Sequence, residues 1–368
     1  MVREKLTYLE ILRGFAILAV LAIHTTSSAI TELSTASSLF PVYKIINAAS
    51  HFAVPAFLFL SSLLLFYHYD ESTKQNWLVF YRKRLKTIVI PYLIWSVFYS
   101  AADSYVKHMS AEDSLLGFVK GLPFGGSYPH LYFIIVIAQF YLAFPLFHLL
   151  FRIRFVKNHP LLCGAAAQTA FYLLNYYALD MKGVGSFIGS YLLYLFLGAY
   201  AAGKLKTITA GGKDWRRWCL FAGFIISAVI YVGQMWLQKT NPHWIPQPYY
   251  SYLNFVSDYS YAAISCIILL QAASLLEGGR LLLSRNTLLS IGTYSFGIYF
   301  IHPFFLLLWR QEVMVHGAIS YHLLIWAGGA VAFILSWLIT IAVQKSRLGV
   351  YIVGKSDSRR LSPASSTT

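Results

Sequence analysis

The sequence is poor in charged residues. Asp, Glu, Lys and Arg together make up 12% of its 368 residues, whereas a soluble domain carries about 25%. Hydrophobic residues account for 58% of the chain, and the mean hydropathy is +0.59. This composition excludes an ordinary soluble globular protein and is typical of an integral membrane protein.

Cysteine is scarce as well. The three cysteines, Cys163, Cys219 and Cys266, are isolated in separate apolar runs, so they form neither a disulfide framework nor a Cys-based metal motif. No pair of histidines has the helical spacing of a zinc motif such as HExxH. We therefore expect no metal site, and the cysteines are expected to pack as small apolar residues.

Long apolar runs recur along almost the whole chain. About 20 apolar residues are needed to cross a bilayer as a helix, and ten runs approach that length. We predict an all-α integral membrane protein with about ten spans, near residues 9–29, 46–67, 88–106, 130–150, 161–179, 186–203, 216–236, 254–276, 288–309 and 320–343. Residues 1–345 would form one membrane domain, and residues 346–368 a short polar, disordered tail on the cytoplasmic side.

We expect the first apolar run to be a retained helix rather than a cleaved signal peptide, because Glu10 and Arg13 interrupt it and further spans follow. No internal repeat is visible, so the inverted-repeat design of many transporters has no support.

The basic residues are unevenly distributed among the loops. Only six of the 29 Lys and Arg residues fall on one side of the predicted topology: Lys44, Lys107, Lys120, Lys182, Lys239 and Arg310. Positively charged loops favour the cytoplasmic side, so we predict that both termini are cytoplasmic. The net charge of +15 is thus a signal of topology, and nucleic-acid binding is not expected.

The first span carries charged and titratable residues on one helix face. Arg13 and His24 are eleven residues apart, which places them within about 20° of the same face and roughly 16 Å apart along a helix. Glu10 lies one turn before Arg13. A purely structural explanation of this pattern is that Arg13 reaches the lipid headgroups and His24 forms a hydrogen bond with a neighbouring helix. Because intramembrane charges usually face a cavity or a partner, we favour a functional site.

Other ionisable residues fall at a similar predicted depth. His302, His130 and His51 lie toward the same side of the membrane as His24, and Asp103 and Asp258 lie near the ends of their spans. Together they predict a polar cavity in the outer half of the bundle.

Five patches resemble the membrane-bound acyltransferase 3 family in order and spacing. YLEILRGFAILAVLAIH is similar to its first helix, in which Arg and His are separated by ten residues, and FAVPAFLFLSSLLL is similar to its second span. RKRLKTIVIPYLIW resembles the basic approach to the third span. GGSYPHLYFIIVIAQFYLAFPL and SIGTYSFGIYFIHPFFL resemble the fourth span and a late one. The resemblance extends over about residues 5–345. The chain departs from the family at Ser62, where glycine is common, and at Thr87, where an arginine often pairs with Arg84.

The resemblance implies transfer of an acyl group, often acetyl, from a cytoplasmic coenzyme A thioester to a carbohydrate, glycolipid or other acceptor in a bacterial cytoplasmic membrane. Acyl-CoA would be a substrate, with no permanently bound cofactor. The motif residues correspond to Arg13 and His24, while Lys83, Arg84 and Lys86 could attract phosphates as point charges. Some family members carry a fused extracellular domain, so a second transfer step here would need a separate partner protein.

The chemistry of acyl transfer assigns roles to these residues. His24 is the candidate base, because histidine titrates near neutral pH. Arg13 is the second candidate catalytic residue, in contact with a phosphate or the thioester carbonyl, and Glu10 would bind the donor together with Lys83, Arg84 and Lys86. His130 and His302 would bind the acceptor or stabilise the oxyanion. Direct transfer and an acyl-histidine intermediate both fit the sequence. The main alternative function is export of a polysaccharide or lipid-linked sugar, because proteins resembling this family have been assigned such roles.

Overall fold

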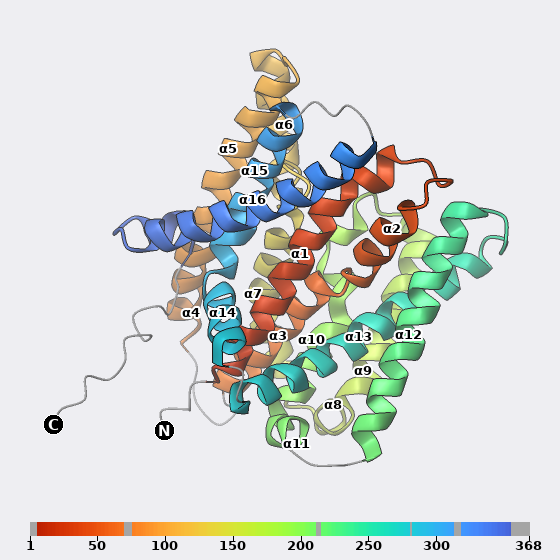
Figure 1. Cartoon of the computed structure of the whole chain (residues 1–368). Coiled ribbons are helices and arrows are strands. Elements are labelled where there is room, and N and C mark those ends of the chain that lie inside the picture. Colours follow the sequence, from red (N-terminus) through yellow and green to blue (C-terminus); the bar gives the residue numbers. More distant parts are fainter. Residues whose placement is uncertain (1–5, 70–75, 211–214, 280–281, 313–317, 355–368) are drawn as a thin grey trace.

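The structure is a computed structural model that describes residues 6–69, 76–210, 215–279, 282–312 and 318–354 (Figure 1). The described part of the chain folds into helices joined by turns. The helices are α1 Tyr8–Glu32, α2 Phe40–Ala49, α3 Ala53–His68, α4 Trp77–Arg84, α5 Ile90–Val106, α6 Ala111–Gly121, α7 Tyr132–Leu150, α8 Arg154–Asn158, α9 Pro160–Leu174, α10 Leu192–Gly203, α11 Leu205–Thr209, α12 Trp215–Thr240, α13 Tyr249–Gly278, α14 Leu282–Thr293, α15 Ser295–Glu312, α16 Ala318–Gln344 and α17 Gly349–Ile352.

Seven helical segments of the described chain are long and apolar enough to cross a membrane, or eight if the bent pair Leu283–Thr293 and Ser295–Gln311 forms one span. Each of the ten predicted spans coincides with a helical segment. The two predicted spans that do not qualify as membrane-spanning helices are 161–179 and 186–203. There α9 and the apolar segment Ile188–Gly203 are too short or too polar to count as spans by themselves.

Helix α1 lies at the centre of the bundle (Figure 1). It contacts α2, α3, α13, α14, α15 and α16, and it is the most buried of the candidate spans. The starts of α1 and α4 lie toward the bottom of Figure 1, and the end of α5 with α6 lies at the top. The two ends of α1 therefore face opposite ends of the bundle.

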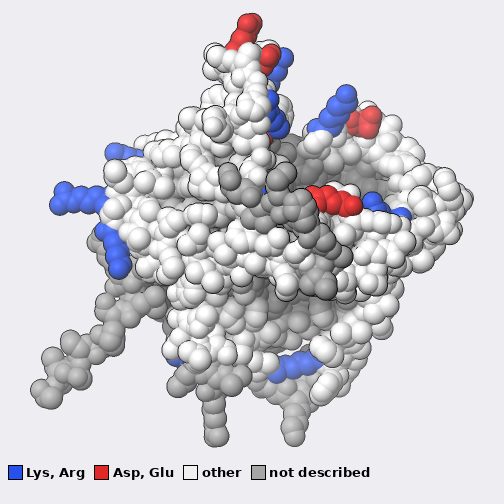
Figure 2. All heavy atoms as spheres, turned by 45° about the horizontal axis from the view of Figure 1, so that its top comes forward, with Lys and Arg blue, Asp and Glu red and all other residues white. Residues whose placement is uncertain are grey.

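The outer surface of the bundle is largely apolar. Long side chains such as Leu142, Leu146, Val229 and Leu323 are more than half exposed, and charged groups are sparse on the face that Figure 2 shows. A protein in water would bury these side chains, whereas lipid tails cover them at no cost. The exposed apolar surface and the candidate spans together make this a multi-pass membrane protein.

The basic residues of α4 lie directly before the predicted third span, 88–106, and are continuous with it. A π-helical turn, Leu85–Val89, connects α4 to α5, so that Trp77–Val106 forms one candidate span. The C-terminal segment is also partly ordered. Helix α17 packs against α5, where the Trp95 indole donates to the carbonyl of Ile352 at 2.7 Å. The rest of the predicted tail, residues 355–368, lies outside the described residues.

Candidate active site

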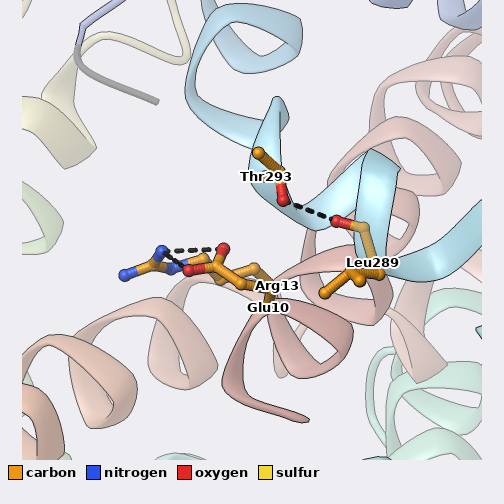
Figure 3. Close-up of polar contacts among 4 residues, drawn as sticks. All are labelled: Glu10, Arg13, Leu289 and Thr293. Carbon is orange, nitrogen blue, oxygen red and sulfur yellow. Dashed lines mark hydrogen bonds and ion pairs between the residues drawn. The ribbon is translucent and has the colours of Figure 1, made fainter. Parts of the chain in front are cut away.

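One end of α1 carries an ion pair. Arg13 Nη1 donates to both carboxylate oxygens of Glu10, at 2.7 and 2.9 Å. The two side chains are three residues apart on the helix, and Figure 3 shows them lying together beside the turn of α14 that carries Thr293. The Thr293 hydroxyl bonds back to the carbonyl of Leu289 at 2.8 Å. Glu10 therefore orients the guanidinium, and part of the Arg13 fork faces away from α14.

The Glu10–Arg13 pair lines a cavity of about 320 Å³, here called the Arg13 cavity. Lys83 and Arg84 of α4 and Thr87 of the π-helical turn line the same cavity. Three basic side chains from two helices thus face one space. The sequence predicted that Glu10, Arg13, Lys83 and Arg84 act together, and the structure brings these four residues to one place.

Lys86 is placed differently. It does not line the Arg13 cavity, and its ammonium group lies over the Tyr351 ring, 5.0 Å from the ring centroid. Arg84 stacks its guanidinium on Tyr141 at 4.5 Å and on Phe80 at 5.3 Å. These cation–π contacts hold Arg84 at the cavity wall. The structure therefore separates Lys86 from the other predicted donor-binding residues.

The approach of α14 to α1 depends on glycine. A Cβ atom added to Gly292 would lie 1.7 Å from the Glu10 carbonyl oxygen, and one added to Gly14 would lie 2.6 Å from that of Leu288. A larger residue at either position would push the two helices apart. The predicted span 288–309 is not straight, because the axes of α14 and α15 differ by 78° at Tyr294. Gly and Ser residues commonly occur at such breaks, and this one turns the start of α15 toward the Arg13 cavity.

Three histidines meet at the other end of α1. The His24 ring centroid is 5.2 Å from that of His302 on α15 and 6.4 Å from that of His130, which precedes α7. The His130 and His302 centroids are 6.1 Å apart. We call these residues the histidine cluster. Residues far apart in the chain are brought into contact here, as their similar predicted depth suggested.

The three rings differ in exposure and bonding. His130 is 2% exposed and His302 is fully buried, whereas His24 is partly exposed. Neither ring nitrogen of His130 has a hydrogen-bond partner, and the same holds for Nε2 of His302. His302 Nδ1 lies 2.9 Å from the carbonyl oxygen of Ile298. A carbonyl only accepts, so Nδ1 donates, and Nε2 of the neutral ring is an unprotonated acceptor.

Aromatic residues surround the cluster, and the sequence reasoning missed them because it treated the many aromatics as interfacial anchors. The rings of Tyr99, Tyr128 and Tyr299 lie 5.0, 5.6 and 5.1 Å from the His130 ring. The Tyr299 hydroxyl donates to the carbonyl of His130. Tyr299 precedes His302 by three residues and Tyr128 precedes His130 by two, and this proximity to the histidines was the available signal.

A second cavity, of about 640 Å³, lies next to Tyr128 and is here called the Tyr128 cavity. Its lining includes Ser127, Tyr128 and the Asp103–Lys107 ion pair, whose charged atoms are 2.7 Å apart. Tyr299 lines the Arg13 cavity and Tyr128 lines the Tyr128 cavity. Both rings contact His130, so the histidine cluster lies between the two cavities.

Arg310 is a further residue at this site, and sequence reasoning counted it only as a loop charge. Its Nη2 donates to the carbonyl of His24 at 2.6 Å and to the Ser27 hydroxyl at 3.2 Å. Since Arg310 and His302 share α15, these bonds fix α15 against α1 where the histidines meet. The candidate residues His51 and Asp258 lie in another group of contacts. Among the described residues, no group of three or more His, Cys, Asp or Glu side chains could hold a metal ion.

Known proteins similar to this chain include two bacterial membrane proteins. The chain is 27% identical over 267 residues, 69% of either chain, to the "Probable poly-beta-1,6-N-acetyl-D-glucosamine export protein" of Staphylococcus aureus strain MRSA252. It is 25% identical over 333 residues, 83% of this chain and 82% of the relative, to the "Putative membrane-bound acyltransferase YfiQ" of Bacillus subtilis strain 168. No solved structure matches the chain. Residues 6–341 match the profile of the acyltransferase 3 family, described as "Acyltransferase domain", and the chain therefore belongs to that family.

Proposed function

We propose that the protein transfers an acyl group, acetyl in the simplest case, from coenzyme A to a hydroxyl of a cell-envelope carbohydrate or glycolipid. One observation carries this proposal: a tyrosine from each of two separate cavities contacts His130, and one of the cavities is lined by three basic side chains. Such an arrangement suits a reaction between an anionic donor and a neutral acceptor that arrive separately.

The Arg13 cavity is the proposed donor site. Arg13, Lys83 and Arg84 present positive charge, and Arg can bind phosphate or a thioester carbonyl through two parallel donors. Glu10 keeps the guanidinium in place. Coenzyme A is a substrate here rather than a resident cofactor. Its acyl-bearing arm would extend past Phe133 and Tyr299, which line the cavity toward the cluster.

The histidine cluster is the proposed reaction centre. His24, the partly exposed ring, would take the proton of the acceptor hydroxyl as the oxygen attacks the thioester carbonyl. The C–S bond then breaks and the thiolate receives that proton. His130 would bind the acceptor or donate to the oxyanion, and His302, whose Nε2 is an acceptor, would accept from an acceptor hydroxyl. In the acyl-histidine alternative, His24 attacks first and the acceptor removes the acyl group in a second step. Rapid acid quenching after mixing with labelled acetyl-CoA separates the two routes, since only the second leaves label on the protein.

The uneven distribution of basic residues supports cytoplasmic termini, with the Arg13 cavity open to the cytoplasm and the Tyr128 cavity to the outside. Single cysteines in a variant lacking Cys163, Cys219 and Cys266 test this orientation. Cysteine at Lys182 should react with an impermeant reagent in intact cells. Cysteine at Lys206, which is exposed as Lys182 is, should react only after permeabilisation, and the reverse pattern would overturn the orientation.

Export of a polysaccharide is the second candidate function, and the name of the S. aureus relative favours it. A passage through the bundle would have to open the contacts of His130 with Tyr128 and Tyr299, which separate the two cavities. The two functions differ in what they consume. Purified protein in lipid, given labelled acetyl-CoA and envelope glycans, should transfer label to glycan in the first case and leave the donor intact in the second.

In cells, mass spectrometry of envelope glycans decides the same question and identifies the acceptor. A deletion strain that produces normal amounts of glycan lacking acyl groups supports transfer. Intracellular accumulation of fully modified glycan would instead support export. If the purified protein needs another cell-envelope protein to modify the final acceptor, a separate partner carries the second transfer step.

A further inference from the structure

Helix α15 begins at the wall of the Arg13 cavity. Ser295 and Phe296, the first two residues of the helix, both line this cavity. The amides of Gly297 and Ile298 close the first turn by donating to the carbonyl of Tyr294, each at 3.1 Å. The amides of Ser295 and Phe296 precede that turn, and the first amides of an α-helix have no partner within the helix. Backbone donors therefore lie at the cavity wall.

The side chain of Ser295 adds a hydroxyl to the same wall. Ser295 is 5% exposed, and its hydroxyl forms no hydrogen bond with the residues that the structure describes. Thr293, at the end of α14, also lines the cavity, but its hydroxyl donates to the carbonyl of Leu289 at 2.8 Å (Figure 3). A buried hydroxyl without a partner is costly. An oxygen atom of a molecule in the cavity would supply the acceptor that Ser295 lacks.

The charged side chains of the cavity favour an anion. Arg13, Lys83 and Arg84 line it, and Glu10 is the one acidic residue among the described lining residues. Both carboxylate oxygens of Glu10 accept from Arg13, so these two charges balance. Lys83 and Arg84 then leave the cavity with a positive charge, to which the N-terminus of a helix adds a partial one. Free amides and this helix dipole together make helix N-termini phosphate-binding sites.

We propose that the start of α15 is a phosphate site, in which the Ser295 hydroxyl and the amides of Ser295 and Phe296 donate to a phosphate group of the donor. The assignment to coenzyme A rests on the proposed function, whereas the preference for an anion rests on the cavity itself. Ser295 precedes Tyr299 by about one helical turn, and Tyr299 lines the same cavity and contacts the His130 ring. A phosphate held at Ser295 therefore leaves the acyl-bearing arm to run along α15 toward the histidine cluster.

Binding of coenzyme A to the purified full-length protein in phosphatidylcholine nanodiscs, measured by calorimetry, tests the site without catalysis. Ser295→Ala removes one donor to a charged group and should weaken the affinity about tenfold. Thr287→Ala is the matched control. The Thr287 hydroxyl, on an exposed part of α14, donates to the carbonyl of Leu283 at 2.9 Å and lies outside the Arg13 cavity, so the affinity should not change. Equal affinities of the unmodified protein and Ser295→Ala would overturn the phosphate site.

Ser295→Asp distinguishes loss of the phosphate site from loss of the fold. A carboxylate in the first turn of a helix is favourable, so the midpoint of thermal unfolding should stay the same or rise. The same carboxylate repels a phosphate, so the affinity for coenzyme A should fall by at least about tenfold. Thr287→Asp adds an equal charge outside the cavity and should lower the affinity by less than about twofold. Equal losses in the two aspartate variants would show that overall charge attracts coenzyme A, and the phosphate site would be wrong.

Two further probes identify what the site binds. Pantetheine has the arm of coenzyme A but no phosphate, so its affinity, measured by competition, should be the same with and without Ser295→Ala. A loss equal to that of coenzyme A would mean that Ser295 contacts the arm, against the proposal. Phosphatidylglycerol added to the nanodiscs should leave the effect of Ser295→Ala in place. If the lipid instead removes that effect, an anionic headgroup occupies the start of α15, and the assignment to the donor is overturned.

Failure of this site and failure of the proposed function give different results. If coenzyme A binds and Ser295→Ala has no effect, the phosphate site is wrong and the proposed acyl transfer stands. If the unmodified protein does not bind coenzyme A, the proposed donor is wrong, and the assignment of the site to that donor falls with it.

Discussion

The two ends of α1 carry polar sites of opposite character. The Arg13 cavity holds paired charges, and the Arg13 and Glu10 side chains keep 31% and 15% of their surface exposed. The histidine cluster holds three rings at centroid distances of 5.2 to 6.4 Å, with ring nitrogens that lack partners. The Glu10–Arg13 ion pair, open to the cavity, suits binding, whereas buried ring nitrogens without partners are costly and usually have a functional reason. The comparison therefore assigns recognition of the donor to one end of α1 and chemistry to the other.

This division predicts that a substitution in the histidine cluster acts on kcat. His24→Ala should lower kcat by about 10²–10⁴-fold, the usual effect of removing a general base. The protein should still fold, because one side chain contributes little to so large a bundle. Turnover of labelled acetyl-CoA by purified protein measures the effect. His68→Ala, at an exposed histidine near the end of α3, is the control and should retain full turnover. A loss of only a few-fold in His24→Ala would remove His24 from the role of base.

Substitution at the opposite end should act on the donor instead. Arg13→Ala removes a charge-assisted contact worth about 1.5–3 kcal/mol, so the KM for acetyl-CoA should rise about 10- to 100-fold while the KM for the acceptor changes little. Arg13→Lys should lie in between, because it keeps the charge and loses the planar fork. Arg13→Ala combined with Glu10→Gln controls for the acid left without its partner. An unchanged KM in both variants would separate Arg13 from the donor.

Arg310 provides a test between these two extremes. It contacts the backbone of α1 at His24 rather than a reacting atom, so it is a positioning residue. Arg310→Ala should lower kcat about tenfold, the equivalent of about 1.4 kcal/mol, and leave the KM for acetyl-CoA near its original value. Arg310→Lys should recover part of the rate because it can still donate to the carbonyl. The neighbouring exposed residue in Gln311→Ala should have no effect. A raised KM with unchanged kcat would place Arg310 in substrate binding.

Sequence reasoning identified the residues of both sites but not all of their partners. Arg13 and His24 could be placed on one helix face because eleven residues return a helix to nearly the same direction. His130 and His302 followed from predicted depth, which depends only on distance from a span end. Tyr299, Tyr128 and Arg310 did not follow, because their roles depend on how neighbouring helices rotate about their axes. The same limit applies to His51, whose predicted depth suggested one shared cavity although its ring contacts the Tyr231 hydroxyl of α12 and Asn47 instead.

The fold shows a similar limit. Apolar length predicts a long span such as α16 well, since about 20 apolar residues have few alternatives. It does not predict that 288–309 bends by 78° at Tyr294 or that Gly292 lies against Glu10 of α1, because both depend on how the helices pack. Apolar length also does not predict that the α-helix in the predicted span 161–179 ends at Leu174.

The smallest expected effect distinguishes two neighbouring lysines that the sequence treated alike. Lys83 lines the Arg13 cavity, whereas Lys86 lies over Tyr351. A lysine acts on phosphate as a point charge, and such contacts at a partly solvated site are worth about 1 kcal/mol or less. Lys83→Ala should therefore raise the KM for acetyl-CoA about two- to fivefold. Lys86→Ala should change it by less than twofold, although it removes the same charge from the same segment. High salt should reduce the effect of Lys83→Ala, because added ions screen an accessible charge. Equal effects of the two substitutions would mean that net charge near the membrane surface, rather than the lining of the Arg13 cavity, attracts the donor.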